Sequence, residues 1–204
     1  DSERALEPEI EMNMKRRYNL DKPLVEQYRR ELQNYMSLDL GYSYKLGDYT
    51  VNQVIAEGLP ISVSLGLLAL MFGATLGIVA GIVAAVFRGG WADVVLRLIA
   101  TIGIALPNFV IASICIIVFV FMLRWFPAAG WGSFKQLVLP AFCLGAPYAA
   151  YIARISRTSM LDVLSQDHIR TAKAKGVGPL RVIFVHGLRG ALLPVVSFLG
   201  PAIA

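Results

Sequence analysis

The sequence has 204 residues, of which 56% are hydrophobic and only 16% are charged, and its mean hydropathy is +0.61. Soluble domains carry about 25% charged residues. This composition excludes a soluble enzyme, a collagen-like chain and a disordered tail, and it predicts a membrane protein. The positive charge is scattered between apolar stretches and does not form one polar face, so a nucleic-acid partner is set aside.

The chain begins with a polar segment, which we place outside the membrane at residues 1–57. Residues 1–58 carry 8 Lys and Arg against 11 Asp and Glu, whereas residues 59–204 carry 11 against 3. No signal-peptide pattern precedes this polar head. We therefore expect an earlier span, outside this sequence, to bring the head across the membrane.

Residues 58–204 contain the apolar stretches that form the predicted transmembrane core. A helix rising about 1.5 Å per residue needs about 20 residues to cross about 30 Å of hydrocarbon. The last stretch is too short to cross completely. The predicted fold is therefore an all-α, polytopic membrane protein, here a fragment with about three complete transmembrane helices and a partial fourth. The predicted spans cover about 58–87, 95–123, 136–160 and 188–204.

Small residues in the spans indicate close helix packing. Gly73, Gly77 and Gly81 recur every four residues, and this G-x-x-x-G spacing lets a second helix approach closely. Cys115 and Cys143 lie inside apolar runs, which is typical of buried small side chains and not of disulfides in loops.

Two prolines mark irregular positions within the second and third spans. Pro107 and Pro147 each remove one helical hydrogen bond, which is tolerated where the freed carbonyls find partners or face a cavity. Asn108, Tyr148 and Tyr151 are polar groups beside these prolines. They are candidates for the lining of a translocation pathway, and the alternative is that each bonds to a neighbouring helix.

The basic loops predict the orientation of the chain. Lys and Arg accumulate on the cytoplasmic side of membrane proteins. This bias places residues 154–189 and the 88–97 loop in the cytoplasm, and it places residues 1–58 and 124–135 outside.

Several motifs are missing from the sequence. No charged residue lies at the centre of a span, which disfavours an ion-coupled carrier or a voltage sensor. The sequence has no G-x-x-x-x-G-K-[ST], H-E-x-x-H or G-x-S-x-G motif. We expect that the chain is not an enzyme and binds no metal or cofactor, so energy for transport must come from a partner.

The cytoplasmic segment 161–187 contains a predicted short helix with marked ends. Ser165 suits the N-cap, and Gly176 suits the left-handed position after the last turn. Ile169 and Ala172 share a lightly apolar face that could dock on another protein. The alternative is an amphipathic linker on anionic headgroups. The candidate contact residues are Asp167, Ile169, Arg170, Thr171, Ala172, Lys173, Ala174, Lys175 and Gly176.

This segment resembles the EAA loop of permease subunits of ABC importers. The resemblance rests on Ala172-x-x-x-Gly176 followed by Leu193-Pro194. Arg170 and Thr171 stand where that family has Glu and its first Ala. These departures are similar to those of the peptide and nickel importer branch, where runs such as LRGALLP at 188–194 are typical.

Other segments are similar to the B subunits of oligopeptide permeases, and this resemblance extends from about residue 2 to residue 201. The similar segments are SERAL at 2–6, YNLDKPL at 18–24, DLGYS at 39–43, LPNFV at 106–110, ARISR at 153–157 and LGP at 199–201.

The resemblance implies a type I ABC importer permease in the bacterial inner membrane. Such a subunit pairs with a second permease subunit and with two cytoplasmic ATPases that bind ATP and magnesium. An external peptide-binding protein delivers the peptide, and lipid surrounds the spans. The helix within 165–176 would be the coupling helix seated in an ATPase. Alternatives are a permease for dipeptides, nickel or glutathione, or a non-transporting anchor whose basic segment binds lipid.

Overall fold

The computed structural model describes residues 12–13, 15, 20–43 and 45–203. The chain divides into two compact units, residues 1–62 and residues 63–204, and each is described by itself. The SERAL segment, and the first two residues of YNLDKPL, lie outside the described residues.

The first unit contains helix α2 (Leu24–Met36) and the loop that leads into helix α3 (Val51–Val86). An isolated antiparallel bridge between Tyr42 and Thr50 closes this loop. The side chain of Asn52 fixes the loop on the first turn of α3. It accepts a 2.8 Å hydrogen bond from the Leu40 amide and donates a 2.5 Å bond to the Leu38 carbonyl.

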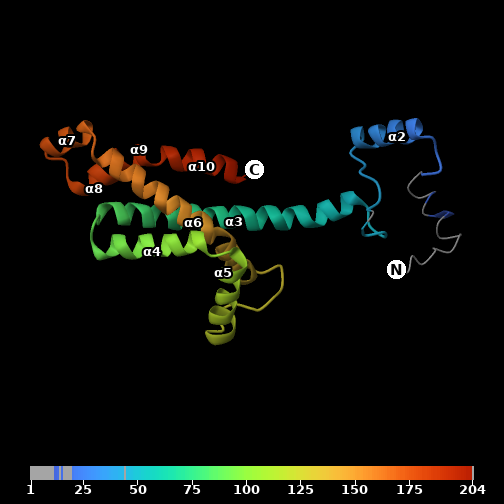
Figure 1. The fold of residues 1–204 in the computed structure, drawn as a ribbon, viewed down its shortest axis with the longest axis horizontal. Coiled ribbons are helices and arrows are strands. Elements are labelled where there is room, and N and C mark those ends of the chain that lie inside the picture. The colour runs from blue at the N-terminus through green and yellow to red at the C-terminus, as the bar shows by residue number, and fades with distance from the viewer. Residues whose placement is uncertain (1–11, 14, 16–19, 44, 204) are drawn as a thin grey trace. The chain divides into compact units, whose positions relative to one another are not determined.

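The second unit is a helical bundle that contains the rest of α3 and all the later helices (Figure 1). In chain order the later elements are α4 (Trp91–Ala105), α5 (Asn108–Cys115), the π-helical η1 (Ile116–Met122), α6 (Phe134–Leu164), α7 (Asp167–Ala174), α8 (Pro179–Arg181), the π-helical η2 (Val182–Gly187), α9 (Leu188–Ala191) and α10 (Leu193–Ile203).

Two helices are continuous and apolar enough to cross a membrane, α3 and α6. They cover the predicted spans at 58–87 and 136–160. Helix α3 begins at Val51, so Pro60 lies inside it. Helix α6 continues to Leu164, with Pro140 and Pro147 inside it. The predicted class, a polytopic α-helical membrane protein, is confirmed.

The predicted span at 95–123 is a bent pair of helices. Helix α4 ends at Ala105, and the helix formed by α5 and η1 continues at 113° to it. The break lies at Leu106-Pro107, where Leu106 is extended with ψ 132°. The reason is steric, because the ring of a proline disfavours helical geometry at the residue before it.

The last predicted span is also a bent pair, Pro179–Ala191 and Leu193–Ala202, with an angle of 44°. It begins at Pro179 and not at 188, because proline at the first helical position is preset for a helix and needs no hydrogen-bond acceptor for its nitrogen. The predicted boundary follows the uncharged stretch, and the absence of charge marks only where a helix enters the hydrocarbon. The helix itself begins earlier and includes the charged residues Arg181 and Arg189.

Helices α3 and α6 pack closely through glycine, as the G-x-x-x-G spacing predicts. A Cβ atom at Gly77 would lie 2.7 Å from the Ala149 carbonyl oxygen, and one at Gly81 would lie 2.5 Å from the Ala153 carbonyl oxygen. Gly145 on α6 approaches the Ala69 carbonyl in the same way. A larger residue at any of these positions would force the helices apart.

The two cysteines are buried and free, as predicted. They form a small core with Val120 and Leu139, which joins α5 and η1 to α6.

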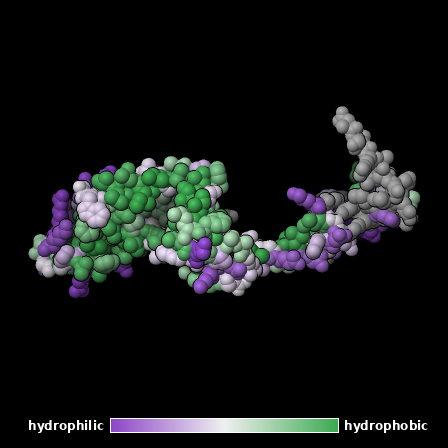
Figure 2. Space-filling model, turned by 90° about the horizontal axis from the view of Figure 1, so that it is seen from below, coloured by the Kyte–Doolittle hydropathy of each residue, from purple (hydrophilic) through white to green (hydrophobic). Residues whose placement is uncertain are grey.

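Figure 2 shows that apolar surface dominates the visible face of the second unit. Hydrophilic residues gather at the end of the second unit where α7 and the turn between α3 and α4 lie.

Candidate functional site

Helix α7 begins two residues after the predicted N-cap. Its N-cap is Gln166, which makes no side-chain capping bond. Ser165 caps the end of α6 instead, because its hydroxyl donates a 2.7 Å hydrogen bond to the Asp162 carbonyl. The prediction of Ser165 as the N-cap of the short helix is therefore wrong, since α6 continues further than its apolar stretch indicates.

The C-terminal end of α7 is a Schellman motif centred on Gly176. Gly176 has a positive φ of 77°, as predicted from its place after the last turn. Its amide donates to the Lys173 carbonyl at 3.0 Å, and the Val177 amide donates to the Ala172 carbonyl at 3.1 Å. This bond pattern satisfies carbonyls at the helix end and reverses the chain direction. Val177 then packs on the same cluster as the helix itself.

The apolar side of α7 is buried against its own chain. Ile169 is fully buried and Ala172 is 8% exposed. Ile169 packs with Val163 of α6 and Val182 of η2. The expectation that Ile169 and Ala172 form the face offered to a partner is therefore corrected, because both side chains are buried and Ile169 holds the helix on α6 and η2.

The opposite side of α7 is polar and exposed. Arg170 lies 3.3 Å from Asp167, and the hydroxyl of Thr171 donates to the Asp167 carbonyl at 3.0 Å. Both interactions are local, so this surface stays open to solvent. The exposed candidates are Asp167, Arg170, Thr171, Lys173, Ala174, Lys175 and Gly176. Their three cations and one anion make the available face of α7 basic.

A second buried cluster joins the C-terminal part of α6, which leads to α7, to α3 and α9. Ala85 of α3, Met160 of α6 and Ala191 of α9 form one buried group. Gly187 allows close approach here, because a Cβ atom on it would lie 2.7 Å from Cε of Met160. The two clusters together connect α7 with α6, and α6 with α3 and α9.

A buried ion pair attaches α4 to α6 nearby. Asp93 is 1% exposed and accepts hydrogen bonds from Arg157 Nε at 2.6 Å and from Arg157 Nη2 at 2.8 Å. The Gly89 amide donates to the same carboxylate at 3.0 Å. Arg97 lies 3.3 Å from it, one turn along α4. Two donors of one arginine and one amide therefore satisfy this carboxylate inside the helical bundle.

The sequence analysis assigns the 88–97 loop to the cytoplasm and gives Asp93 no role, so it does not predict this pair. One signal could have revealed it, since Asp93 is the only carboxylate between Glu57 and Asp162. A single acid among apolar helices has to find a cation, because an isolated buried charge is very costly.

The candidate pathway residues lie on two different helices. Tyr148 and Tyr151 are on α6, three residues apart, and are 37% and 39% exposed. Tyr151 stacks on Phe198 of α10 at 6.2 Å between ring centres and lies under the guanidinium of Arg154 at 5.6 Å. Asn108 is exposed at the first position of α5. No hydrogen bond or ring contact joins Asn108 to either tyrosine in the described part of the chain.

These features define the class of protein to which the chain belongs. The chain is a polytopic helical membrane protein with broken spans and a short helix fixed at one end of the bundle. Residues 77–204 match the family described as binding-protein-dependent transport system inner membrane component. The chain belongs to this family.

Curated relatives agree with the family match. The oligopeptide transport system permease protein OppB of Haemophilus influenzae is 43% identical over 203 residues, covering 98% of this chain and 66% of the relative. OppB of Salmonella typhimurium is 42% identical, with 98% and 66% covered. The dipeptide transport system permease protein DppB of Bacillus subtilis is 41% identical, with 99% and 66% covered. The chain thus spans about two thirds of the length of these relatives.

Proposed function

We propose that this chain is part of the permease subunit of an ATP-binding-cassette importer that carries oligopeptides across the bacterial inner membrane. The family match and the relatives named as oligopeptide permeases support this function. The broken spans support it as well, because irregular helices at membrane depth are suited to lining a passage.

The proposed assembly supplies the energy from outside the chain. A second permease subunit completes the passage, and two cytoplasmic ATPases bind ATP and magnesium. A peptide-binding protein on the outer side delivers the substrate. The chain itself performs no bond chemistry in this assembly, so it acts as a gated passage and not as an enzyme.

Helix α7 is the proposed contact with an ATPase. The observation that carries this proposal is that Ile169 and Ala172 are buried while the basic face of α7 is exposed. A short helix anchored on α6 and η2 can pass a rigid-body movement of its partner to the spans. Its exposed residues Arg170, Lys173 and Lys175 then favour an acidic surface on that partner.

The experiment uses the complete importer reconstituted in liposomes with its binding protein. Ala174→Trp places a bulky side chain on the exposed face of α7, and Lys173→Glu reverses a charge there. Both are expected to reduce ATP-driven peptide uptake and ATPase co-purification, while the subunit still assembles in the membrane. Ala129→Trp, at an exposed position in the loop before α6, is the matched control. Uptake at the unmodified level in both α7 variants would overturn the coupling role.

The passage residues belong to the same proposal. Tyr148, Tyr151 and Asn108 supply polar groups that a peptide backbone needs on the walls of its path. Their partial exposure supports this role. Single cysteines at these positions, in a background without Cys115 and Cys143, should be protected from a thiol reagent during turnover with peptide. Unchanged labelling would assign these side chains to helix contacts.

A dipeptide permease is the second candidate, because the Bacillus subtilis relative named for dipeptides is nearly as similar as the oligopeptide permeases. Competition of labelled peptide uptake by unlabelled peptides of increasing length separates the two functions. Nickel and glutathione serve as further competitors in the same assay.

A further inference from the structure

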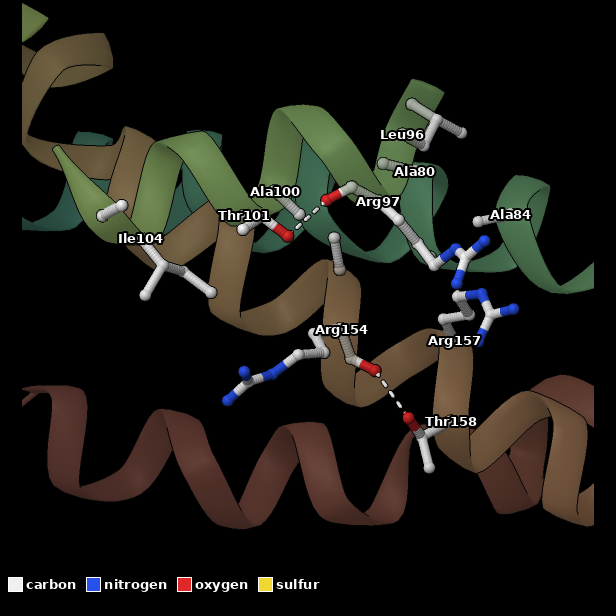
Figure 3. Close-up of a pocket in the computed structure, with 13 residues that line it drawn as sticks. Ala80, Ala84, Leu96, Arg97, Ala100, Thr101, Ile104, Arg154, Arg157 and Thr158 are labelled. Atoms are coloured by element: carbon white, nitrogen blue, oxygen red, sulfur yellow. Dashed lines mark hydrogen bonds between the residues drawn. The ribbon is translucent and has the colours of Figure 1, made fainter. Parts of the chain in front are cut away.

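Two adjacent cavities lie between α3, α4 and α6 in the second unit. One has a volume of about 310 Å³ and is bordered by Arg97 and Arg154 (Figure 3). The other has a volume of about 360 Å³. They share four lining residues, namely Ala80, Leu96, Ala100 and Ala153. The two cavities are therefore adjacent along the helices, and together we call them the groove.

The first cavity is charged. Arg154 lies on one side of it, and Arg97 and Arg157 point toward each other on the other side (Figure 3). Asp93 pairs with Arg157 at 2.6 Å and also lies 3.3 Å from Arg97, so it balances one of the three positive charges. Arg97 stays 54% exposed at its side chain, and Arg154 is exposed. The net charge of these four side chains is positive, which favours an anionic ligand.

The second cavity has only apolar side chains and glycine on its walls, among them Ile99, Ile111 and Phe142. On α6, residues between 142 and 153 line the apolar cavity. Residues between 153 and 158 of the same helix line the charged cavity. The apolar part therefore extends about 16 Å along α6. That length is about half of the hydrocarbon thickness of roughly 30 Å, which is the depth of one leaflet.

From this arrangement we propose that the groove binds an anionic glycerophospholipid. The phosphate lies at the charged end of the groove, which Arg97 and Arg154 line, and one acyl chain lies in the apolar part. A charged end at the membrane surface and an apolar end toward its middle match the polarity of a lipid. A peptide fits poorly, because its amides would find no hydrogen-bond partner on the side chains of the apolar walls. Basic pockets between helices on the cytoplasmic side are suited to anionic headgroups, and the basic loops predict that side here.

The test is native mass spectrometry of the complete purified protein, delipidated and then titrated with phosphatidylglycerol or with phosphatidylcholine of the same chains. Phosphatidylglycerol should be retained in preference. Arg97→Gln with Arg154→Gln should lower its retention by roughly 30-fold. Ala100→Phe fills the shared part of the groove without changing charge and should also lower the retention of phosphatidylglycerol. Arg189→Gln and Val79→Phe, both at exposed positions outside the groove, are the matched controls.

Soluble glycerol phosphate separates a lipid from a free phosphate. It should not displace phosphatidylglycerol, because the acyl chain contributes to binding. Equal retention of both lipids, displacement by glycerol phosphate, or retention unaffected by the arginine and Ala100 variants would overturn the proposal. A protein helix filling the groove in the assembled transporter would also overturn it. Circular dichroism and melting of each variant identify loss of fold, and Arg154→Gln alone, which leaves Arg97 and Asp93 untouched, repeats the test.

Discussion

Asp93 and Arg157 are 64 residues apart in the sequence, and their side chains meet at 2.6 Å across α4 and α6. The carboxylate lies in the first turn of α4, where the helix dipole favours negative charge. Arg157 is 20% exposed at its side chain, so the pair is largely withdrawn from solvent. This contact fixes the start of α4 on the helix that leads to α7.

Asp93→Asn is expected to destabilise the protein strongly, because it leaves Arg157 without its counter-charge. Removing one partner of a buried pair costs about 3–5 kcal/mol, and the partial exposure of Arg157 favours the lower end. Thermal unfolding of the detergent-purified protein measures this loss. Asp162→Asn, at an exposed carboxylate near the end of α6, is the control and should leave the melting temperature unchanged. Equal melting of the two variants would contradict a structural role for the pair.

Replacing both partners separates the charge from the packing. Asp93→Leu with Arg157→Met should recover most of the lost stability, because apolar residues of similar volume often replace a buried ion pair without cost. If transport stays impaired in this stable double variant, the ion pair is needed for movement and not only for folding.

Gly77→Ala should destabilise the contact between α3 and α6, because the new methyl group would lie 2.7 Å from both the Ala149 carbonyl oxygen and Cβ of Ile152. Overpacking of this kind costs about 1–3 kcal/mol. Gly66→Ala on the same helix meets nothing within 4 Å. It should therefore keep or slightly raise stability, since alanine favours a helix more than glycine. Thermal unfolding of the two variants compares them directly, and an equal change of melting temperature in both would contradict a specific packing role for Gly77.

Gly176 should tolerate substitution in the order asparagine, alanine, valine. Its Cβ position is open, so the cost comes from φ of 77° and not from a clash. Left-handed backbone geometry costs a residue with a side chain about 1–2 kcal/mol, less for asparagine and more for a branched residue. Peptide uptake by the reconstituted importer should follow the same order. Gly178→Ala, at an exposed glycine with an extended backbone, is the control. Equal uptake with valine and asparagine at 176 would show that the Schellman motif is dispensable.

Ile169→Ala should loosen α7 from α6 and η2. Truncating a fully buried isoleucine typically costs about 2–5 kcal/mol, and here the loss falls on a short helix held by few side chains. Hydrogen exchange of the amides at 167–174 should become faster, while exchange in α3 stays the same. Ala174→Trp changes only the exposed face and should leave that exchange unchanged. If Ile169→Ala also leaves it unchanged, α7 is held by its ends alone.

Properties that depend on local sequence were determined by the sequence alone. The apolar stretches identified α3 and α6 as membrane-crossing helices, Pro107 marked the break after α4, and Gly176 marked the end of α7. Each follows from the solvent or from backbone sterics at the position itself. The glycine spacing also predicted close packing, because it places three small residues on one side of a helix whichever helix it meets.

Only the tertiary structure decided which surfaces meet. Neither the partner of Asp93 nor the internal use of Ile169 and Ala172 follows from their spacing, since a carboxylate or an apolar face accepts any complementary neighbour. The groove beside Arg97 and Arg154 exists because three helices from separate parts of the sequence, α3, α4 and α6, lie beside one another. Helix periodicity states which side of a helix is apolar, and packing between distant segments determines what covers that side.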